Sequence, residues 1–97
     1  MKIYIDIDNT ICNSPDTMDY TKSTPIQENI NKGNKLYDSG NEITYWTARG
    51  MNSGLDWRKL TRQQLKQWGV KYHKLKFKKP PFDLFIDDKV LNAKDWV

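Results

Sequence analysis

Short apolar runs alternate with longer amphipathic stretches along the chain. The run from Lys2 to Ile7 is rich in β-branched and aromatic residues and predicts a buried strand. The run from Glu42 to Thr47 has the same character and predicts a second strand. Shorter apolar runs at residues 70–75 and 84–86 predict the third and fourth strands.

The stretches between these runs predict two helices. Thr24 is expected to cap the first helix, with Pro25 at its first position and Gly40 at its end. The second helix is predicted over residues 55–68, with Gly69 as its stop. Strands alternating with helices favour a mostly parallel sheet with ligands bound at the carboxyl ends of its strands. The predicted fold class is α/β, a Rossmann-like three-layer sandwich.

A mostly polar segment at about 12–24 separates the first strand from the first helix and predicts a short flap. The 97 residues fit one domain, residues 1–97, with no room for a second. Cys12 is the only cysteine and cannot form an internal disulfide, which favours a reducing, cytoplasmic setting. The apolar run at the N-terminus is too short to predict a secretory segment or a membrane span.

The chain is basic, with 16 Lys and Arg against 12 Asp and Glu and a net charge of +4. The basic residues concentrate between Arg58 and Lys79, and such a patch attracts anions. No nucleic-acid-reading motif accompanies them. We therefore favour a solvated face that steers phosphorylated small molecules, with a nucleic-acid surface as the less favoured interpretation.

Acidic residues stand where two of the predicted strands end. Asp6 and Asp8 close the first strand, and Asp87 and Asp88 close the fourth. Parallel strands end at one edge of a sheet, so these carboxylates are expected to converge there. Close carboxylates repel unless a hard cation holds them, and Mg²⁺ prefers such oxygen ligands. The pattern predicts a Mg²⁺ site.

Four segments, in order, resemble the motifs of the haloacid dehalogenase-like superfamily. IYIDIDNT, Ile3 to Thr10, is similar to the first motif, with its two Asp and a Thr. Thr47 resembles the second-motif Ser or Thr, and Lys79 before a proline resembles the third-motif lysine. LFIDD, Leu84 to Asp88, is similar to the fourth motif. The resemblance spans almost the whole chain and implies a phosphohydrolase.

The resemblance implies a role for each acid. Asp6 is expected to attack phosphorus and form an aspartyl-phosphate, and Asp8 to act as general acid and then general base. Asp6, the backbone carbonyl of Asp8 and Asp87 are expected to bind Mg²⁺, with Asp88 supporting through water. Thr10 is expected to fix the turn after the first strand by hydrogen bonding.

The resemblance also implies a set of phosphate contacts. The Thr47 hydroxyl, the Asn9 backbone N–H and Lys79 are expected to hold the phosphoryl oxygens. Ala48 and Arg49 follow Thr47 and are candidate substrate contacts. For Arg49, contact with substrate and pairing with a neighbouring acid at the surface are equally favoured.

Three further assignments need comment. Asn9 stands where glycine is common in the family, and Asn tolerates unusual backbone angles. Lys79 is preferred to Lys78 as the phosphate-binding lysine because a proline follows it. His73, the only histidine, is expected to be a surface or structural residue.

The gaps between motifs are too short for the cap domains that many relatives carry, so the site is expected to be open. A Mg²⁺-dependent phosphatase acting on a sugar phosphate or related metabolite is the first prediction. A nucleotide or polynucleotide end phosphatase is an alternative, and an inactive phosphate-binding module is another. A homo-oligomer would offer one way to cover the site.

Overall fold

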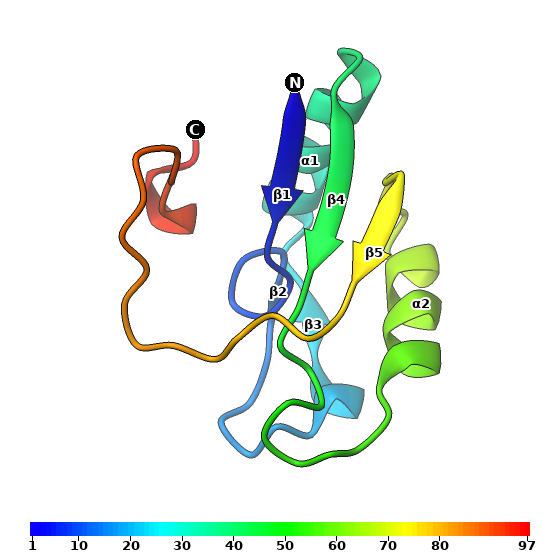
Figure 1. Cartoon of the computed structure of the whole chain (residues 1–97). Helices are drawn as coiled ribbons and strands as arrows, with labels where there is room; N and C mark the ends of the chain where they lie inside the picture. Colours follow the sequence, from blue (N-terminus) through cyan, green and yellow to red (C-terminus); the bar gives the residue numbers. More distant parts are fainter.

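The computed structural model describes all 97 residues and is built on a three-stranded parallel sheet (Figure 1). The strands are β1 (Lys2–Ile5), β4 (Glu42–Trp46) and β5 (Lys74–Lys76), in the order β1-β4-β5. Tyr4 lies beside Thr44 in the register of the first pair. The predicted α/β class with a parallel sheet is confirmed. The third strand was expected at residues 70–75, but β5 begins four residues later and ends at Lys76.

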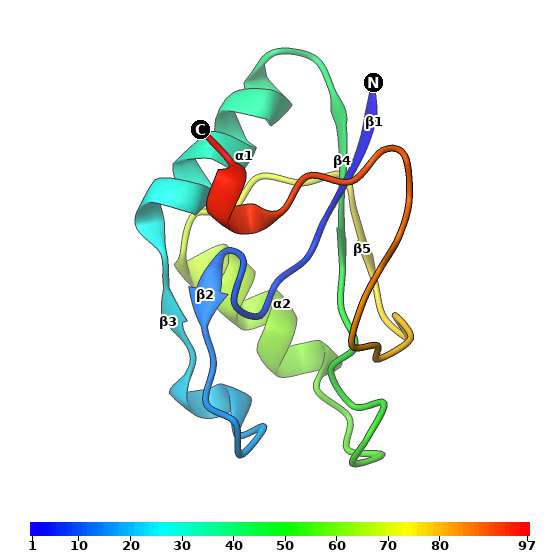
Figure 2. The same cartoon turned by 90° about the vertical axis from the view of Figure 1, so that its left-hand side faces the viewer.

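The two helices cover the same face of the sheet (Figure 2). They are α1 (Gln27–Asp38) and α2 (Arg58–Gln67), and each connects one strand to the next in the sheet. Right-handed crossovers that step in the same direction place their helices on the same face. The structure therefore has two layers where the sequence predicted three. Neither helix has the length and the apolar composition that a membrane span requires.

The core lies between the sheet and these helices. Successive strand residues point to opposite faces, and the odd-numbered positions face the helices. Ile5, Ile43 and Tyr45 are buried there against Ile30 of α1 and Leu65 of α2. The alternation of the strands thus sets which face of the sheet is covered.

The predicted flap contains its own small structure. Residues Cys12–Asn13 (β2) pair antiparallel with Thr24–Pro25 (β3), and the 3-10 turn η1 (Tyr20–Lys22) lies between them. Thr24 and Pro25 were expected to start a helix, and this was wrong. They are held in the β2–β3 pair, so α1 begins at Gln27 without a side-chain cap.

The start of α2 was also predicted too early. The helix was expected to begin at residue 55, but Leu55 is 60% exposed and the helix begins at Arg58. Residues 54–57 belong to no helix, and Gly54, directly before the expected start, has a φ of +71°. The ends of both helices follow the expectation, because Gly40 and Gly69 adopt positive φ after them.

The predicted fourth strand does not form. Residues 84–86 belong to no strand, and Ile86 is 87% exposed. Lys78 turns the chain with a φ of +65°, and Pro80 and Pro81 have no N–H to donate to a ladder. The following segment runs apart from β1 until the 3-10 turn η2, Ala93–Asp95 (Figure 1). A short apolar run forms a strand only where the chain brings it to a free edge of the sheet, and residues 84–86 do not reach the edge at β1.

Candidate active site

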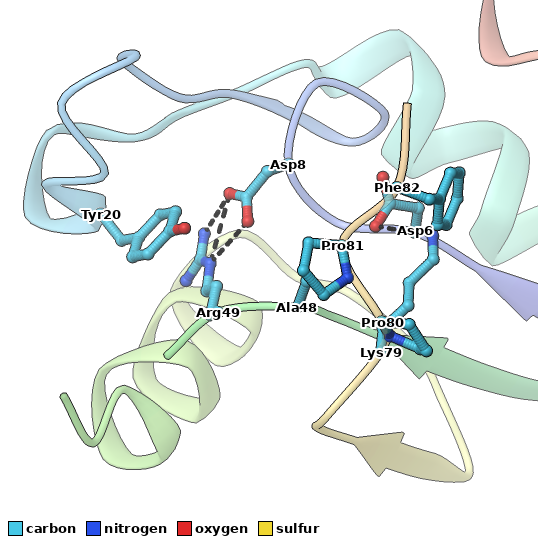
Figure 3. Close-up of a pocket in the computed structure, with 9 residues that line it drawn as sticks. All are labelled: Asp6, Asp8, Tyr20, Ala48, Arg49, Lys79, Pro80, Pro81 and Phe82. Atoms are coloured by element: carbon cyan, nitrogen blue, oxygen red, sulfur yellow. Dashed lines mark hydrogen bonds and ion pairs between the residues drawn. The ribbon is translucent and has the colours of Figure 1, made fainter. Parts of the chain in front are cut away.

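A pocket of about 280 Å³ opens where the strands end (Figure 3). Its walls come from three places: the turn after β1 with the flap, the turn after β4, and the basic segment after β5. The nine lining residues are Asp6, Asp8, Tyr20, Ala48, Arg49, Lys79, Pro80, Pro81 and Phe82. Five of them were named from the sequence as candidate site residues.

Asp6 lies on one side of the pocket with Lys79. The Lys79 Nζ is 3.3 Å from Asp6 Oδ1, and the Thr10 hydroxyl donates to Asp6 Oδ2 at 3.2 Å. Burial raises the pKa of Asp6 above its usual value, and the charge of Lys79 opposes that rise. Asp6 is therefore a part-buried carboxylate with a cation beside it, and Thr10 makes the turn-fixing contact expected of it.

Lys79, and not Lys78, reaches this carboxylate. The side chain of Lys79 is 17% exposed and lines the pocket. Lys78 is exposed and adopts the left-handed turn that brings Lys79 inward. The Lys79 N–H also donates to the Thr47 carbonyl at 3.1 Å, which ties the basic segment to the end of β4.

Asp8 faces a different partner (Figure 3). The Arg49 Nη2 donates to Asp8 Oδ1 at 2.9 Å, and Nε donates to Oδ2 at 3.0 Å. The Ser14 hydroxyl donates to Oδ1 at 2.5 Å. All these groups donate, so the contacts suit Asp8 as an acceptor carboxylate. The two acids of the first motif thus point to two separate cations.

Arg49 is held from the helix side as well. Its Nη1 donates to Gln64 Oε1 at 2.6 Å and to the Thr61 hydroxyl at 3.0 Å. The Tyr20 ring lies 4.6 Å from the guanidinium carbon, close enough for a cation–π contact. The guanidinium is fully buried. The sequence left substrate contact and surface pairing open for Arg49. It pairs with an acid, Asp8 of the pocket wall, but the guanidinium itself is buried and not at the surface.

Thr47 and Asn9, two of the expected phosphate contacts, are engaged within the chain. Thr47 is 1% exposed, and its hydroxyl oxygen accepts the Arg49 backbone N–H at 3.1 Å. The Asn9 backbone N–H donates to the Cys12 carbonyl at 2.7 Å, so it is not free for phosphate in this conformation. The φ of +60° at Asn9 agrees with the tolerance expected of asparagine.

Asp87 and Asp88 do not come to the pocket. Both were expected there, but neither lines it, and both are exposed. Asp87 accepts the Lys89 backbone N–H at 3.0 Å in a local turn. The expectation depended on the fourth strand, which would have carried these acids to the edge of the sheet. Without that strand they stay on the segment that runs apart from β1.

The residues at the pocket would supply part of the ligand set for the Mg²⁺ ion that the motif resemblance implies. The Asp6 side chain is 37% exposed, and the backbone carbonyl of Asp8 accepts no hydrogen bond. No three His, Cys, Asp or Glu side chains come together as a metal cluster. Mg²⁺ usually keeps several waters and binds through one or two carboxylates plus substrate phosphate. The residues that would hold it here are Asp6, through its carboxylate, and Asp8, through its carbonyl.

Sequence reasoning missed several residues of this site. Thr61 and Gln64 share the buried face of α2 with Leu65. A glutamine at a core-facing helix position needs a buried polar partner, and this could have indicated their role in the sequence. Tyr20 and Phe82 line the pocket, and each is an aromatic residue in a polar or irregular segment. Phe82 lies two residues before the predicted fourth strand. It was therefore not considered as a pocket residue.

The other singled-out residues have structural roles. His73 Nδ1 accepts the Ile43 backbone N–H at 3.0 Å, and its ring stacks on Tyr37. Cys12 is fully buried, and burial raises the pKa of its thiol to about 11. A thiol with that pKa stays protonated at neutral pH and is a poor nucleophile.

The chain matches no family model and no curated protein. It is similar to a crystal structure of a protein from Vibrio cholerae, with a TM-score of 0.86 and 22% sequence identity. The match covers 98% of this chain and 85% of the other. At this identity the likeness concerns the fold alone, which the two proteins share.

Proposed function

We propose that this protein is a phosphomonoester hydrolase of the haloacid dehalogenase-like type, with Asp6 as the nucleophile. The observation that carries the proposal is the Asp6–Lys79 pair in an open pocket, 3.3 Å apart, with Asp8 on the same pocket wall. The order of the four sequence motifs supports it. A simple phosphate-binding module would need the cation of Lys79 but no carboxylate facing the phosphate.

In the first step an Asp6 oxygen attacks phosphorus while the bond to the ester oxygen breaks. The product is an aspartyl-phosphate, and the leaving alkoxide takes a proton from Asp8. Lys79 offsets the charge on the phosphoryl oxygens as they approach the Asp6 carboxylate. For this step Asp8 must carry a proton, so it must give up at least one of its donors from Arg49.

In the second step water attacks phosphorus of the aspartyl-phosphate and releases inorganic phosphate and the Asp6 carboxylate. Asp8 accepts the proton from this water. The donors from Arg49 and Ser14 suit that role, since they hold the carboxylate in a fixed orientation. A Mg²⁺ ion held by the Asp6 carboxylate and the Asp8 carbonyl would supply positive charge that offsets the repulsion of the carboxylate and the phosphate.

The pocket offers few groups that could recognise the alcohol part of the ester. Its lining beyond the acids and cations consists of Tyr20, Ala48, Pro80, Pro81 and Phe82, and among these only Tyr20 carries a polar side-chain group. A sugar phosphate or related metabolite remains the substrate class proposed from the sequence, with a nucleotide or polynucleotide end as the alternative. The open wall admits substrates larger than the pocket.

The proposal is tested by phosphate release from sugar phosphates, nucleotides, phosphorylated oligonucleotides and an aryl phosphate, with Mg²⁺ and with EDTA. Wild type is expected to release phosphate from some of these only with Mg²⁺, and Asp6→Asn to release none. Asp16→Asn, which changes an exposed acid of the flap, is the matched control and is expected to keep wild-type activity. Activity retained by Asp6→Asn, or release from no compound, would overturn the proposal.

A further inference from the structure

One face of the sheet carries no helix (Figures 1 and 2). Because the odd-numbered strand positions are buried against α1 and α2, the even-numbered positions point to this uncovered face. Tyr4 of β1 is 53% exposed on this face, and its ring meets that of Trp46 on β4 edge to face, with centroids 5.9 Å apart. We call Tyr4, Trp46 and the lysines around them the open face.

The open face is basic. Lys2, Lys74 and Lys76 occupy even-numbered positions of β1 and β5 and are exposed. Lys76 Nζ donates to the Tyr4 hydroxyl at 3.0 Å, which holds an ammonium beside the ring. The one acid among these strand positions, Glu42, pairs with Lys74 at 3.3 Å. The face therefore presents aromatic rings within positive charge, which complements a polyanion.

The open face leads into the candidate site. The Lys79 ammonium lies 5.8 Å from the centre of the Trp46 ring and 3.3 Å from Asp6. It also lies 5.3 Å from the centre of the Phe82 ring, which lines the pocket. Tyr4 and Asp6 are two positions apart at the end of β1, about 7 Å along an extended chain. One cation thus joins the aromatic rings to the nucleophile.

We propose that the open face binds single-stranded nucleic acid and brings its phosphorylated end to Asp6. The second half of this statement rests on the proposed function, and the first half does not. Stacking on Tyr4 and Trp46 explains the rings, and contact with backbone phosphates explains the lysines. A sugar phosphate bound in the pocket would use neither, so this inference favours the polynucleotide end, the alternative substrate named above, over a sugar phosphate.

Single strands fit this face better than duplexes do. The exposed Tyr4 ring and the half-buried Trp46 ring can stack with unpaired bases, whereas the bases of a duplex are stacked on one another and hidden from the face. The lysines sit around the rings within the strands, so backbone and base contacts are made by the same few nucleotides. Every base has a stacking face, so little sequence preference is expected.

Binding is tested by fluorescence anisotropy with a labelled oligothymidylate that has no terminal phosphate. The expected result is saturable binding that weakens steeply with salt, and weaker binding of a duplex of equal charge. Tyr4→Ala is expected to weaken binding about tenfold, while Tyr4→Phe keeps the ring and binds like wild type. Near-UV circular dichroism of each variant shows whether its fold is retained.

Charge placement has a matched control. Lys2→Gln with Lys76→Gln removes two charges from the open face, and Lys59→Gln with Lys66→Gln removes two exposed charges from α2. The first pair is expected to weaken binding at least tenfold and to lower the salt slope by about 1.4 if both lysines contact phosphates. Equal effects of the two pairs, equal affinity for duplex, or no binding at low salt would overturn the inference.

Other occupants give distinct results. A sulfated polysaccharide is a second polyanion that the face could bind. If it binds as tightly as the oligothymidylate, and Tyr4→Ala changes neither affinity, the face recognises charge alone and the inference fails. If sedimentation shows a dimer that Tyr4→Ala dissociates, a second copy covers the face and the inference also fails. Binding by Asp6→Asn with wild-type affinity would support the surface even if no phosphate release were found, so the two proposals fail separately.

Discussion

Arg49 and Asp8 form an ion pair in which only the acid has access to solvent. The Arg49 Nη2 lies 2.9 Å from Asp8 Oδ1, the guanidinium is fully buried, and the Asp8 side chain is 21% exposed. A buried guanidinium cannot lose its proton and depends on its partners for compensation. Asp8, proposed as the proton-transferring acid and base, is therefore also the counter-ion of a core residue.

We predict that Asp8→Ala destabilises the fold strongly. Removal of the carboxylate leaves the Arg49 guanidinium buried with only neutral partners, and breaking such a pair typically costs about 3–5 kcal/mol of unfolding free energy. Asp8→Asn is expected to cost less, because an amide oxygen still accepts a hydrogen bond. Urea denaturation at neutral pH measures both changes.

The surface pair Arg58–Asp56 is the control for this prediction. Its Nη2–Oδ2 distance is 2.8 Å, similar to that of the buried pair, but both side chains are 62% exposed. Water compensates either charge there, so Asp56→Ala is expected to leave the denaturation midpoint almost unchanged. Similar losses in Asp8→Ala and Asp56→Ala would show that burial of Arg49 is not what matters.

Lys79 is predicted to set the acid limb of the activity profile. The pKa of Asp6 is raised by burial, and Lys79 is the strongest group that opposes the rise. Lys79→Gln is therefore expected to raise the pKa of Asp6 further and to move the acid limb of kcat/KM to higher pH. Carboxyl NMR titration of Asp6 follows the same shift without any substrate. Lys78→Gln, which removes an exposed neighbouring charge, should leave the titration in place.

Asp6 is predicted to lower stability at neutral pH. Its pKa is higher in the folded than in the unfolded chain, so ionisation in the fold is unfavourable. The contribution to stability is complete below the unfolded pKa of about 3.8 and is lost as pH rises through the folded value. Asp6→Asn should thus be more stable than wild type at pH 7, with the gap closing in acid. Urea denaturation across pH checks this, and a gap that widens in acid would contradict it.

Gly50 is predicted to be intolerant of a side chain. Its φ is +88°, and a Cβ placed there would lie 2.5 Å from the Leu55 carbonyl oxygen. Gly54, with a φ of +71° and no atom within 4 Å of the place a Cβ would take, is the control. Each alanine variant is expected to lose about 1–2 kcal/mol of unfolding free energy because its backbone is left-handed. Gly50→Ala is expected to lose more because its Cβ would also clash with the Leu55 carbonyl oxygen. Equal midpoints in urea would contradict this.

Much of the fold follows from local pattern. The strand runs that became β1 and β4 carry β-branched and aromatic residues over several consecutive positions, and Gly40 and Gly69 stop both helices as expected. Asp6 and Lys79 were named from motifs far apart in the chain, and the parallel sheet brings them to one edge. The strands and the helix ends depend on backbone preferences and on side chains close in sequence, whereas Asp6 and Lys79 were named from the motifs that resemble those of a known superfamily.

Other features depend on which distant segments meet. The run at residues 84–86 has strand-like composition, yet it pairs with no edge and leaves Asp87 exposed. The burial of Arg49 needed Gln64 of α2 and Asp8 of the turn after β1 to converge on it, and no short window of sequence contains all three.

By itself, the sequence determined the α/β class, the order of its main elements and the edge of the sheet where charged residues gather, because periodicity and turn chemistry act between near neighbours. Only the tertiary structure decided that both helices take one face, that the other stays open, and which acid compensates Arg49. The first two outcomes depend on the order in which the strands join the sheet, and the third depends on which charges are buried together. Both are decided by contacts between segments that are distant in the sequence.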